Sequence, residues 1–541
     1  MAQTPIIPGF APDPSIVRIK NNYFLVTSSF HLFPGLPIYT STDLVSWTQI
    51  GNATNRTSQL SLSASNALIH NIDGAPSEFL IGAGGLYAPT IRHHKDRTYI
   101  VCTNVRHGYK DTENTPRPGI AFDNFIVYTD DIWSDIWSDP IYFDFYGIDP
   151  DLFFDDDERV YVAGSSWNTI PSTINCFEID LATGRKLSTE KSIWEGFTKV
   201  IPEGPHIYKR NDWYYILDSE GGTHETHQLS IARSENIWGP YENCPANPIL
   251  APSTTREGFQ YIQYNGHGDL FQDGKGNWWL VFLAGRVDRD GRCVMGRETF
   301  ICPVQWPEDG WPVIKHPLPM DIASRVSGPD GSISVPSVFH PQVGFVWIRD
   351  PDLEMFDIVD GGRVINITPS VNDLDHSIGP ISFVGQRQRL LDGQATVTLQ
   401  TSDDPTLAEH GVRAGLAFYK EEHRFARITY DFETSIVTFE MKNAGRNPAI
   451  SITFSNITGP VVPGSDIQIR IQYTEQVLKF GYRVGAVEDS DSEWVSLGTV
   501  DSLDFTDHDF TGPCIGVYAA SKDIGGAGLS STVSFVDLVV S

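Results

Sequence analysis

The sequence contains few cysteines, few positive charges and no long hydrophobic run. Its six cysteines are scattered without the Cys-x-x-Cys spacing of a metal site: Cys102, Cys176, Cys244, Cys293, Cys302 and Cys514. One or two disulfides are compatible with this pattern, with Cys293 and Cys302 the nearest pair, but spacing alone does not define the pairing. Because no stretch of about 20 apolar residues occurs, we expect no membrane-spanning helix.

Lysine and arginine (39 residues) are outnumbered by aspartate and glutamate (68), so the formal charge is −29. This charge repels a phosphate backbone and an anionic lipid surface, so neither nucleic acid nor a membrane is an expected partner. A neutral ligand fits better. The chain has 13 Trp, 20 Tyr and 30 Phe, which suits the stacking of sugar rings on aromatic faces, although the core of a large β-protein would use most of them.

The first residues, MAQTPIIPGF, lack the charged and apolar regions of a secretory signal peptide. This start is typical of a cytosolic protein or of a mature secreted chain. Four Asn-x-Ser/Thr sequons, at Asn52, Asn55, Asn366 and Asn456, favour secretion. We therefore expect an extracellular protein.

A strand–turn–strand unit recurs five times in the N-terminal part of the chain. The copies begin at Asp13, Ala88, Asp149, Gly204 and His267, and the next residues, Pro14, Pro89, Pro150, Pro205 and Gly268, lie 75, 61, 55 and 63 residues apart. Each interval has room for about four short strands. Five such sheets around an axis predict a five-bladed β-propeller; a two-sheet sandwich of hairpins is the weaker alternative.

Residues 426–441, 466–484 and 531–540 alternate apolar and polar side chains with the strand period. The sequence therefore predicts an all-β chain, with a propeller catalytic domain over residues 1–325 and an antiparallel, concanavalin-like β-sandwich packed on it over residues 326–541. We favour a sandwich that stabilises the propeller and closes one side of its pocket. An independent carbohydrate-binding module is the alternative.

The repeat brings acidic residues together. The first strand of each blade lines the central channel, so Asp13, Asp149 and His267 occupy equivalent positions, with Glu203 one residue earlier in its own copy. Converging carboxylates raise each other's pKa, and glycoside hydrolysis uses such a set: one carboxyl donates a proton while another activates water. We predict Glu203 as general acid and Asp13 as general base, with Asp149 orienting Glu203 and raising its pKa.

The motifs GFAPDPS, GIDPDLFFDDD, EGPHIYKRNDWYYILDSEGGT, GHGDLFQD and GRETF, together with the second domain, resemble glycoside hydrolase family 43 over nearly the whole chain. The resemblance implies a five-bladed propeller, an inverting mechanism and release of pentoses from plant hemicellulose by a β-xylosidase or an α-L-arabinofuranosidase. It assigns to Asp13, Asp149 and Glu203 the same three roles.

The resemblance also implies a set of sugar-binding residues. Phe30, Thr223 and Arg286 are expected to line the sugar pocket, where the guanidinium fork would donate to sugar hydroxyls. His267 is expected to help hold a central Ca²⁺ or a water, and no cofactor is required for the chemistry. The loop at Phe510 of the second domain is expected to reach the site.

Two departures from the family's xylosidases bear on specificity. Where these enzymes have Phe-Glu-Trp-Phe-Pro-Gly, this chain has FHLFPG from Phe30, and Tyr87 stands where they carry Trp before Ala-Pro. We expect both changes at the pocket rim, where they look more like fungal arabinofuranosidases acting on arabinoxylan.

The expected activity is therefore release of α-L-arabinofuranose side chains from arabinoxylan or its oligosaccharides. An exo-acting β-1,4-xylosidase is the first alternative and a non-catalytic carbohydrate-binding protein the second. A retaining fructan hydrolase is disfavoured, because the Asn-Asp-Pro-Asn-Gly opening of that family is missing.

Overall fold

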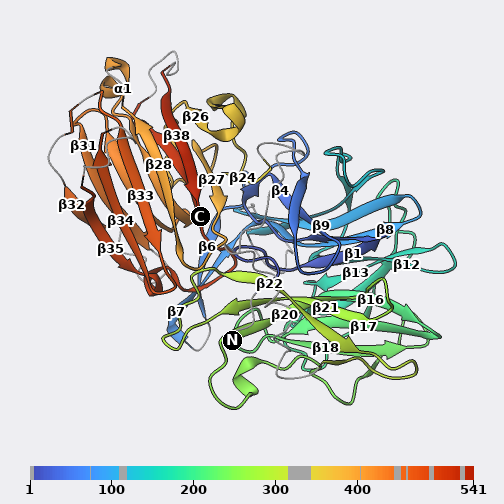
Figure 1. Ribbon diagram of the computed structural model, residues 1–541. Coiled ribbons are helices and arrows are strands. Elements are labelled where there is room, and N and C mark those ends of the chain that lie inside the picture. The colour runs from blue at the N-terminus through green and yellow to red at the C-terminus, as the bar shows by residue number, and fades with distance from the viewer. Residues whose placement is uncertain are drawn as a thin grey trace.

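The computed structural model describes residues 5–72, 75–108, 119–314, 343–401, 404–443, 453–457, 461–462, 464–485, 493–523 and 531–541. Strands dominate the chain, and Figure 1 shows them gathered into two bodies, one coloured blue to green and the other mostly orange to red. Helical segments are short: α1 (Pro405–Glu409) and the 3₁₀ turns η1 (Ser253–Thr255), η3 (Leu353–Met355), η4 (Asp360–Gly362) and η5 (Ser502–Phe505).

Five four-stranded antiparallel sheets form the first body, as the repeat predicts. Blade 1 contains β1 (Ser15–Ile19), β2 (Asn22–Val26), β4 (Gly35–Ser41) and β5 (Thr48–Thr54). Blade 2 contains β8 (Gly85–His94), β9 (Arg97–His107), β10 (Ile120–Thr129) and β11 (Ile141–Phe143). Blade 3 contains β12 (Gly147–Phe154), β13 (Val160–Ser166), β14 (Thr173–Glu178) and β15 (Lys191–Trp194). Blade 4 contains β16 (Glu203–Arg210), β17 (Trp213–Glu220), β18 (Gln228–Ser234) and β19 (Glu242–Asn243). Blade 5 contains β20 (Ile262–Gln272), β21 (Trp278–Arg286), β22 (Arg297–Gln305) and β23 (Val313–Ile314).

The first strand of each blade is its innermost strand. β1 packs against both β8 and β20, so the fifth blade closes the ring on the first. Apolar side chains fill the spaces between neighbouring blades, for example Ile216 of blade 4 with Ala163 of blade 3. The five inner strands therefore surround one axis, and equivalent positions of the repeat meet at the same end of it.

The same backbone irregularity occurs in four of the inner strands and, in blade 1, two residues before the inner strand begins. Asp13, Ala88, Asp149, Gly204 and His267 all have a positive φ, of 55°, 33°, 56°, 57° and 40°. In blades 2 to 5 the pairing register with the second strand shifts beside this residue, as in a β-bulge. Left-handed backbone at a non-glycine residue costs about 1–3 kcal/mol, and surrounding packing must hold it in place. The bulges fix the direction of the side chains at the end of the channel.

Two large antiparallel sheets form the second body, confirming the predicted sandwich. The order in the first sheet is β3 (Leu32–Phe33), β24 (Phe345–Ile348), β27 (Phe383–Arg387), β37 (Cys514–Ala520), β29 (Arg413–Glu421), β30 (Arg424–Asp431), β31 (Ile436–Asn443) and β32 (Thr453–Ile457). The order in the second is β25 (Phe356–Val359), β26 (Val364–Ile367), β38 (Val533–Val540), β28 (Gly393–Gln400), β33 (Ile467–Tyr473), β34 (Val477–Val484) and β35 (Val495–Asp501). Their apolar faces, with Leu416, Val517 and Ile469 among many others, pack into one core.

The two bodies exchange strands. β3, which precedes the third strand of blade 1, pairs with β24 of the sandwich through Phe33 and Trp347. A separate three-stranded sheet joins β6 (Ala67–Ile72) and β7 (Ala75–Ala83) from the N-terminal half to β36 (His508–Asp509) from the C-terminal half. The predicted boundary at residue 325 lies outside the described residues, and these exchanged strands show that the two halves are not independent in space.

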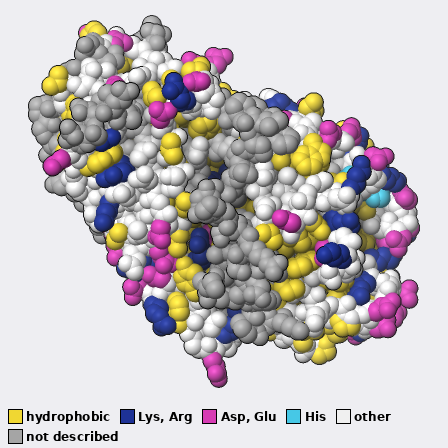
Figure 2. All heavy atoms as spheres, viewed as in Figure 1, with side chains coloured by type: hydrophobic (Ala, Val, Ile, Leu, Met, Phe, Trp, Pro, Cys, Tyr) yellow, Lys and Arg dark blue, Asp and Glu magenta, His cyan; other side chains and the backbone are white. Residues whose placement is uncertain are grey.

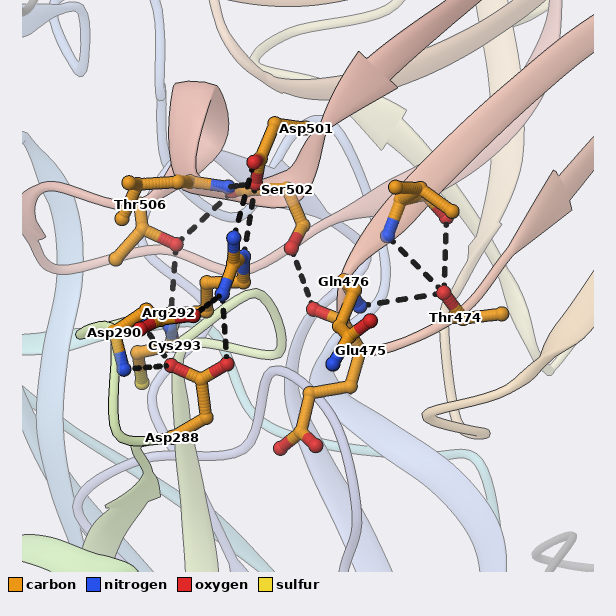
Figure 3. Close-up of polar contacts among 12 residues, drawn as sticks. Asp288, Asp290, Arg292, Cys293, Thr474, Glu475, Gln476, Asp501, Ser502 and Thr506 are labelled. Atoms are coloured by element: carbon orange, nitrogen blue, oxygen red, sulfur yellow. Dashed lines mark hydrogen bonds and ion pairs between the residues drawn. The ribbon is translucent and has the colours of Figure 1, made fainter.

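A polar contact also joins blade 5 to the sandwich, as Figure 3 shows. Arg292 Nε and Nη2 donate to the two carboxylate oxygens of Asp501 at 2.8 and 3.0 Å. The next residue, Cys293, donates its backbone N–H to Thr506 Oγ1 at 3.1 Å. The sandwich segment around η5 is thereby attached to the loop that precedes β22.

All six cysteines are buried as free thiols, so the disulfides considered from the sequence are absent. Among the described residues, no helix is both long and apolar enough to cross a membrane. On the face shown in Figure 2, Asp and Glu side chains are spread along the edges of both bodies, and Lys and Arg side chains lie among them.

Because strands of each half pair with strands of the other, we expect the full chain to unfold in a single cooperative transition. Differential scanning calorimetry should give one endotherm whose van't Hoff enthalpy equals its calorimetric enthalpy. Arg292→Gln should move that endotherm to lower temperature without splitting it. Two separated endotherms in the wild-type protein would contradict this coupling.

Candidate active site

One cavity of about 580 Å³ opens at the end of the channel where the bulges lie. The structure places most of the sequence-predicted residues around it: Asp13, Asp149, Glu203, His267, Phe30, Tyr87, Thr223 and Phe510. The four residues Asp13, Asp149, Glu203 and His267 come from four different blades. A cavity of this size is typical of sites that bury a small ligand.

Asp13 lies two residues before β1 of blade 1 and is only 5% exposed. Its Oδ2 accepts a hydrogen bond of 2.5 Å from Ser28 Oγ, and Ser28 Oγ in turn accepts from the backbone N–H of Ala88 in blade 2. Its Oδ1 lies 3.5 Å from Arg297 Nη1 and 3.6 Å from His267 Nδ1. The carboxylate is thus held by groups from blades 1 and 5, and the guanidinium of Arg297 is a nearby cation.

Glu203 is the first residue of β16, and 16% of its side chain is exposed to the cavity. Burial and the charge of Asp13 raise the pKa of Glu203 to about 7, against the opposing effect of Arg297. A carboxyl with this pKa is protonated in mildly acidic water. It can therefore donate a proton at a pH where ordinary carboxyls cannot.

Asp149 lies next to the acid in space. Its Oδ2 accepts the backbone N–H of Gly204 at 3.0 Å, so it holds the residue that follows Glu203. Burial, Glu203 and Asp13 raise the pKa of Asp149 well above its usual value. The charge of Glu203 thus acts on Asp149, and the contact with Gly204 orients the strand that carries Glu203.

Arg286 does not line the cavity. It forms a two-pronged ion pair with the fully buried Glu298, at 2.7 and 2.9 Å, and Glu298 also accepts the backbone N–H of Gly9. The guanidinium in the cavity belongs to Arg297, which pairs with Gly285 across β21 and β22. Side chains alternate along a strand, so Arg297 and Glu298 point to opposite faces. The motif GRETF contains Arg297 and would have identified it.

Arg297 links the carboxylates to the sandwich. Nη1 donates to Thr223 Oγ1 at 2.8 Å, and Nη2 donates to the backbone oxygen of Phe510 at 3.1 Å. The ring of Phe30 lies 4.7 Å from that of Tyr87 and 5.8 Å from that of Phe510. The second domain therefore supplies part of the cavity wall, as expected for the loop at Phe510.

Four histidines that line the cavity were not found from the sequence: His70, His107, His224 and His508. The ring of His224 lies 4.4 Å from that of His508, which donates to Glu225 at 2.7 Å. Burial, His508 and Arg297 lower the pKa of His224 to about 3. His508 is 283 residues from its partner Glu225. No local sequence pattern indicates such a pair.

The opposite wall of the cavity is apolar. Phe122 and Trp167 meet edge to face with ring centroids 5.2 Å apart, and Ile148 and Ile201 also line this side. This wall comes from blade 2, blade 3 and the loop before blade 4. The cavity therefore combines a charged end with an aromatic and aliphatic end, which suits a sugar whose two faces differ in polarity.

His31, the first departure noted in the FHLFPG segment, does not lie at the rim. It is 1% exposed and sits behind Phe30, with its ring 6.1 Å from that of Tyr419 in the sandwich. Burial, Arg349 and Arg387 lower the pKa of His31 to about 3. Only the second departure, Tyr87, touches the cavity.

A guanidinium occupies the axis beneath the cavity. Arg92 of β8 contacts Asp151 of β12 at 2.7 Å and Asp269 of β20 at 2.9 Å, and also donates to His206 Nδ1 at 3.0 Å. Although burial acts against ionisation, Arg92 and His206 lower the pKa of Asp269 to about 2. Ser15 of β1 also donates to Asp269, so all five inner strands take part.

These contacts do not fit the calcium ion expected near His267. Among the described residues, no group of three or more His, Cys, Asp and Glu side chains could hold a metal. The axial carboxylates Asp151 and Asp269 are already neutralised by Arg92, and His267 Nδ1 faces Asp13. No step of the chemistry is therefore assigned to a metal.

The comparisons with known proteins agree with this architecture. A model described as "Glycosyl hydrolases family 43" matches residues 2–312, and one described as "Beta xylosidase C-terminal Concanavalin A-like domain" matches residues 340–532. A "Xylosidase/arabinosidase" of Butyrivibrio fibrisolvens is 29% identical over 96% of both chains. A non-reducing-end α-L-arabinofuranosidase of Bacteroides ovatus is 35% identical over 66% of this chain and 59% of its own. The crystal structure of a xylan β-1,4-xylosidase from Bacillus halodurans superposes with a TM-score of 0.80 at 25% identity, over 99% of both chains.

The axial guanidinium leads to a prediction about metals and stability. We expect EDTA to leave the activity unchanged and added Ca²⁺ not to increase it. Arg92→Met leaves Asp151 and Asp269 buried without a counter-charge and should cost about 3–5 kcal/mol of unfolding free energy. Because the pKa of Asp269 is lowered, this loss should be full above pH 4 and should shrink as the pH falls toward 2.

Urea denaturation and activity assays after chelation are the measurements. Arg97→Gln, which breaks the exposed pair with Asp130, is the matched control and should cost less than about 1 kcal/mol. Activity that is lost in EDTA and restored by Ca²⁺ would contradict the assignment.

Proposed function

The chain belongs to glycoside hydrolase family 43, and on that premise we propose that it is an inverting, exo-acting enzyme that releases α-L-arabinofuranose from arabinoxylan or its oligosaccharides. The observation that supports this most directly is that Asp13, Asp149 and Glu203, from three different blades, share one cavity with Arg297. Such a set of carboxyl groups is costly to bury and suits acid–base chemistry on a glycosidic bond.

In the proposed reaction, Glu203 protonates the glycosidic oxygen as its bond to the anomeric carbon breaks. Asp13 takes a proton from a water that attacks the same carbon from the opposite face. The raised pKa of Glu203 supports the first role, and the hydrogen bond from Ser28 with the nearby Arg297 supports the second. Asp149 keeps the acid's strand in position through Gly204. Each proton transfer contributes about 10²–10⁴-fold to the rate.

Arg297 and Thr223 are placed to bind hydroxyls of the released sugar. The guanidinium lies between Asp13, Thr223 and the rings of Phe30 and Phe510, so it can donate in a fixed geometry while the rings contact the apolar face of the sugar. The opposite wall with Phe122 and Trp167 is then available for the rest of the substrate.

Preference for arabinose is supported by Tyr87, which lines the cavity where the family's xylosidases carry Trp, and by the similarity to the Bacteroides ovatus arabinofuranosidase. Exo-acting β-1,4-xylosidase activity is the second candidate. The full-length similarity to the Bacillus halodurans xylan β-1,4-xylosidase favours it.

The products of digestion test the proposal. Wheat arabinoxylan should yield arabinose as the main monosaccharide, and proton NMR of the first product should show the inverted anomer. Glu203→Gln should lower the release by about 10²–10⁴-fold. Glu195→Gln, which removes an exposed glutamate paired with Lys199, is the matched control. Xylose as the main product would establish the xylosidase alternative, and unchanged release by Glu203→Gln would point to a sugar-binding role for this cavity.

The pH dependence follows from the acid. Since Glu203 acts in its protonated form and its pKa is about 7, kcat/KM for an oligosaccharide should be high below pH 6 and fall tenfold per unit above pH 7. Initial rates between pH 4 and 9 measure this. A falling limb centred at pH 5 or lower would mean that Glu203 is not the acid.

A further inference from the structure

His227 lies immediately before β18, and its ring occupies a space between blades 4 and 5 that is shaped for it. The residue is 1% exposed. Gly266 of β20 makes room for the ring, because a Cβ at that position would lie 2.3 Å from both Cε1 and Nε2. The backbone N–H of His227 donates to the carbonyl of His224 at 3.0 Å, which fixes the turn before the strand. The ring is therefore held in one orientation.

One nitrogen of this ring has a defined role. His227 Nδ1 lies 3.1 Å from the backbone oxygen of Tyr264, and a carbonyl oxygen can only accept, so Nδ1 carries a hydrogen. Tyr264 has a φ of 61° beside the register shift between Gln263 and Gly266, and this irregularity presents its carbonyl to the ring. The bulge in β20 thus selects the tautomer.

The other nitrogen must then be unprotonated. Burial lowers the pKa of His227 to about 3, with His267 and Arg297 acting in the same direction and the Tyr264 carbonyl opposing them, so the ring is neutral at the pH of most assays. Its single proton is on Nδ1. Nε2 is buried without a hydrogen-bond partner and lies 4.0 Å from Glu203 Oε1. The ring nitrogen that lies 4.0 Å from the carboxyl group therefore carries a lone pair.

A lone pair distinguishes the two forms of a carboxyl group. The lone pair accepts a hydrogen bond from a carboxylic acid. It has no hydrogen to donate to a carboxylate, and it repels the carboxylate oxygens. We propose that His227 is a positioning residue that accepts a hydrogen bond from the Glu203 acid through Nε2, holding that carboxyl protonated and oriented between turnovers. This role rests on the proposed function of Glu203. The present separation of 4.0 Å is longer than a hydrogen bond, but catalytic hydrogen bonds are often long without substrate and shorten in the substrate complex.

The proton balance is that of the proposed reaction. When the glycosidic bond breaks, its electron pair goes to the leaving oxygen, and the Glu203 proton goes there with it. Glu203 is then a carboxylate beside a lone pair, which favours its return to the acid by a proton from solvent. His227 itself neither gains nor loses a proton.

Other groups act on the same carboxyl from each neighbouring blade. The charged and titratable groups that face Glu203 or His227 are Asp13, Asp149, Asp218, His267 and Arg297. Burial, Glu220 and Glu203 raise the pKa of Asp218 well above its usual value. Of these groups, only Arg297 favours the carboxylate form of Glu203. The contribution of His227 therefore adds to that of burial and Asp13.

The direct test is the titration of Glu203 in protein labelled with ¹³C at glutamate Cδ, with Glu203→Gln identifying the signal. His227→Leu removes the lone pair and should lower the pKa of Glu203 by about one unit, a tenfold change in its protonation equilibrium. His93→Leu, which removes a histidine at the tip of a blade 2 hairpin, should leave the titration unchanged. An unchanged Glu203 titration in His227→Leu overturns the proposal.

Kinetics separate this role from a structural one. On an arabinoxylan oligosaccharide, His227→Leu should lower kcat by about tenfold and move the basic limb of the pH profile down by about one unit. On a dinitrophenyl pentoside, whose leaving group needs no proton, kcat should stay within about twofold. Equal losses on both substrates overturn the proposal and indicate a damaged site.

A measurement on the wild-type protein covers the case in which the variant does not fold. In protein labelled with ¹⁵N at histidine, the His227 ring should show a protonated Nδ1 and an unprotonated Nε2 down to pH 5. The opposite tautomer, or a charged ring at pH 6, overturns the proposal. If the wild-type enzyme hydrolysed neither the arabinoxylan oligosaccharide nor the dinitrophenyl pentoside, only the proposed function would be contradicted. The two NMR measurements need no turnover, so they would still test the role of His227.

Discussion

A left-handed backbone residue in or just before the inner strand of every blade is the constraint on which the site depends. At Asp13, Asp149 and His267 the chain accepts this conformation without glycine, and in blade 4 the strained position falls on Gly204 while the acid, Glu203, precedes it. The cost is met by packing between blades. Three carboxyl groups from distant parts of the chain are thereby fixed at one end of the axis, where they are largely buried and their charges interact.

The buried charges inside the propeller form two layers, one neutralised by ion pairs and one with more carboxyl groups than cations. Below the cavity, Arg92 neutralises Asp151 and Asp269 and draws all five inner strands together. At the cavity itself, three carboxyls share the guanidinium of Arg297, so at least one of them holds a proton. The lower layer gives rigidity and the upper layer gives reactivity, and they are separated by only a few residues along each strand.

The fold and the three acids could be predicted because each copy of the repeat forms one blade. Residues at the same position in different copies therefore lie around the same axis. The register of the repeat placed Asp13, Asp149 and Glu203 correctly around one cavity. The choice of Arg286 over Arg297 was wrong because the sequence does not show that Arg286 pairs with the buried Glu298, whereas Arg297, in the motif GRETF, lines the cavity. The contacts of Arg92 with Asp151 and Asp269 on the axis could not be predicted either, because nothing in the sequence of β8 indicates that its arginine reaches them. Contacts such as His508 with Glu225 join segments that no local pattern connects.

Because Phe510 and His508 of the C-terminal half form part of the cavity wall, both halves of the chain affect how this site evolves. The acids come from the N-terminal half and part of the enclosure comes from the C-terminal half, so substrate choice is inherited from both. A recombination that joined halves of two relatives would combine one parent's chemistry with the other parent's enclosure, and new specificity could arise without any change to the reacting groups.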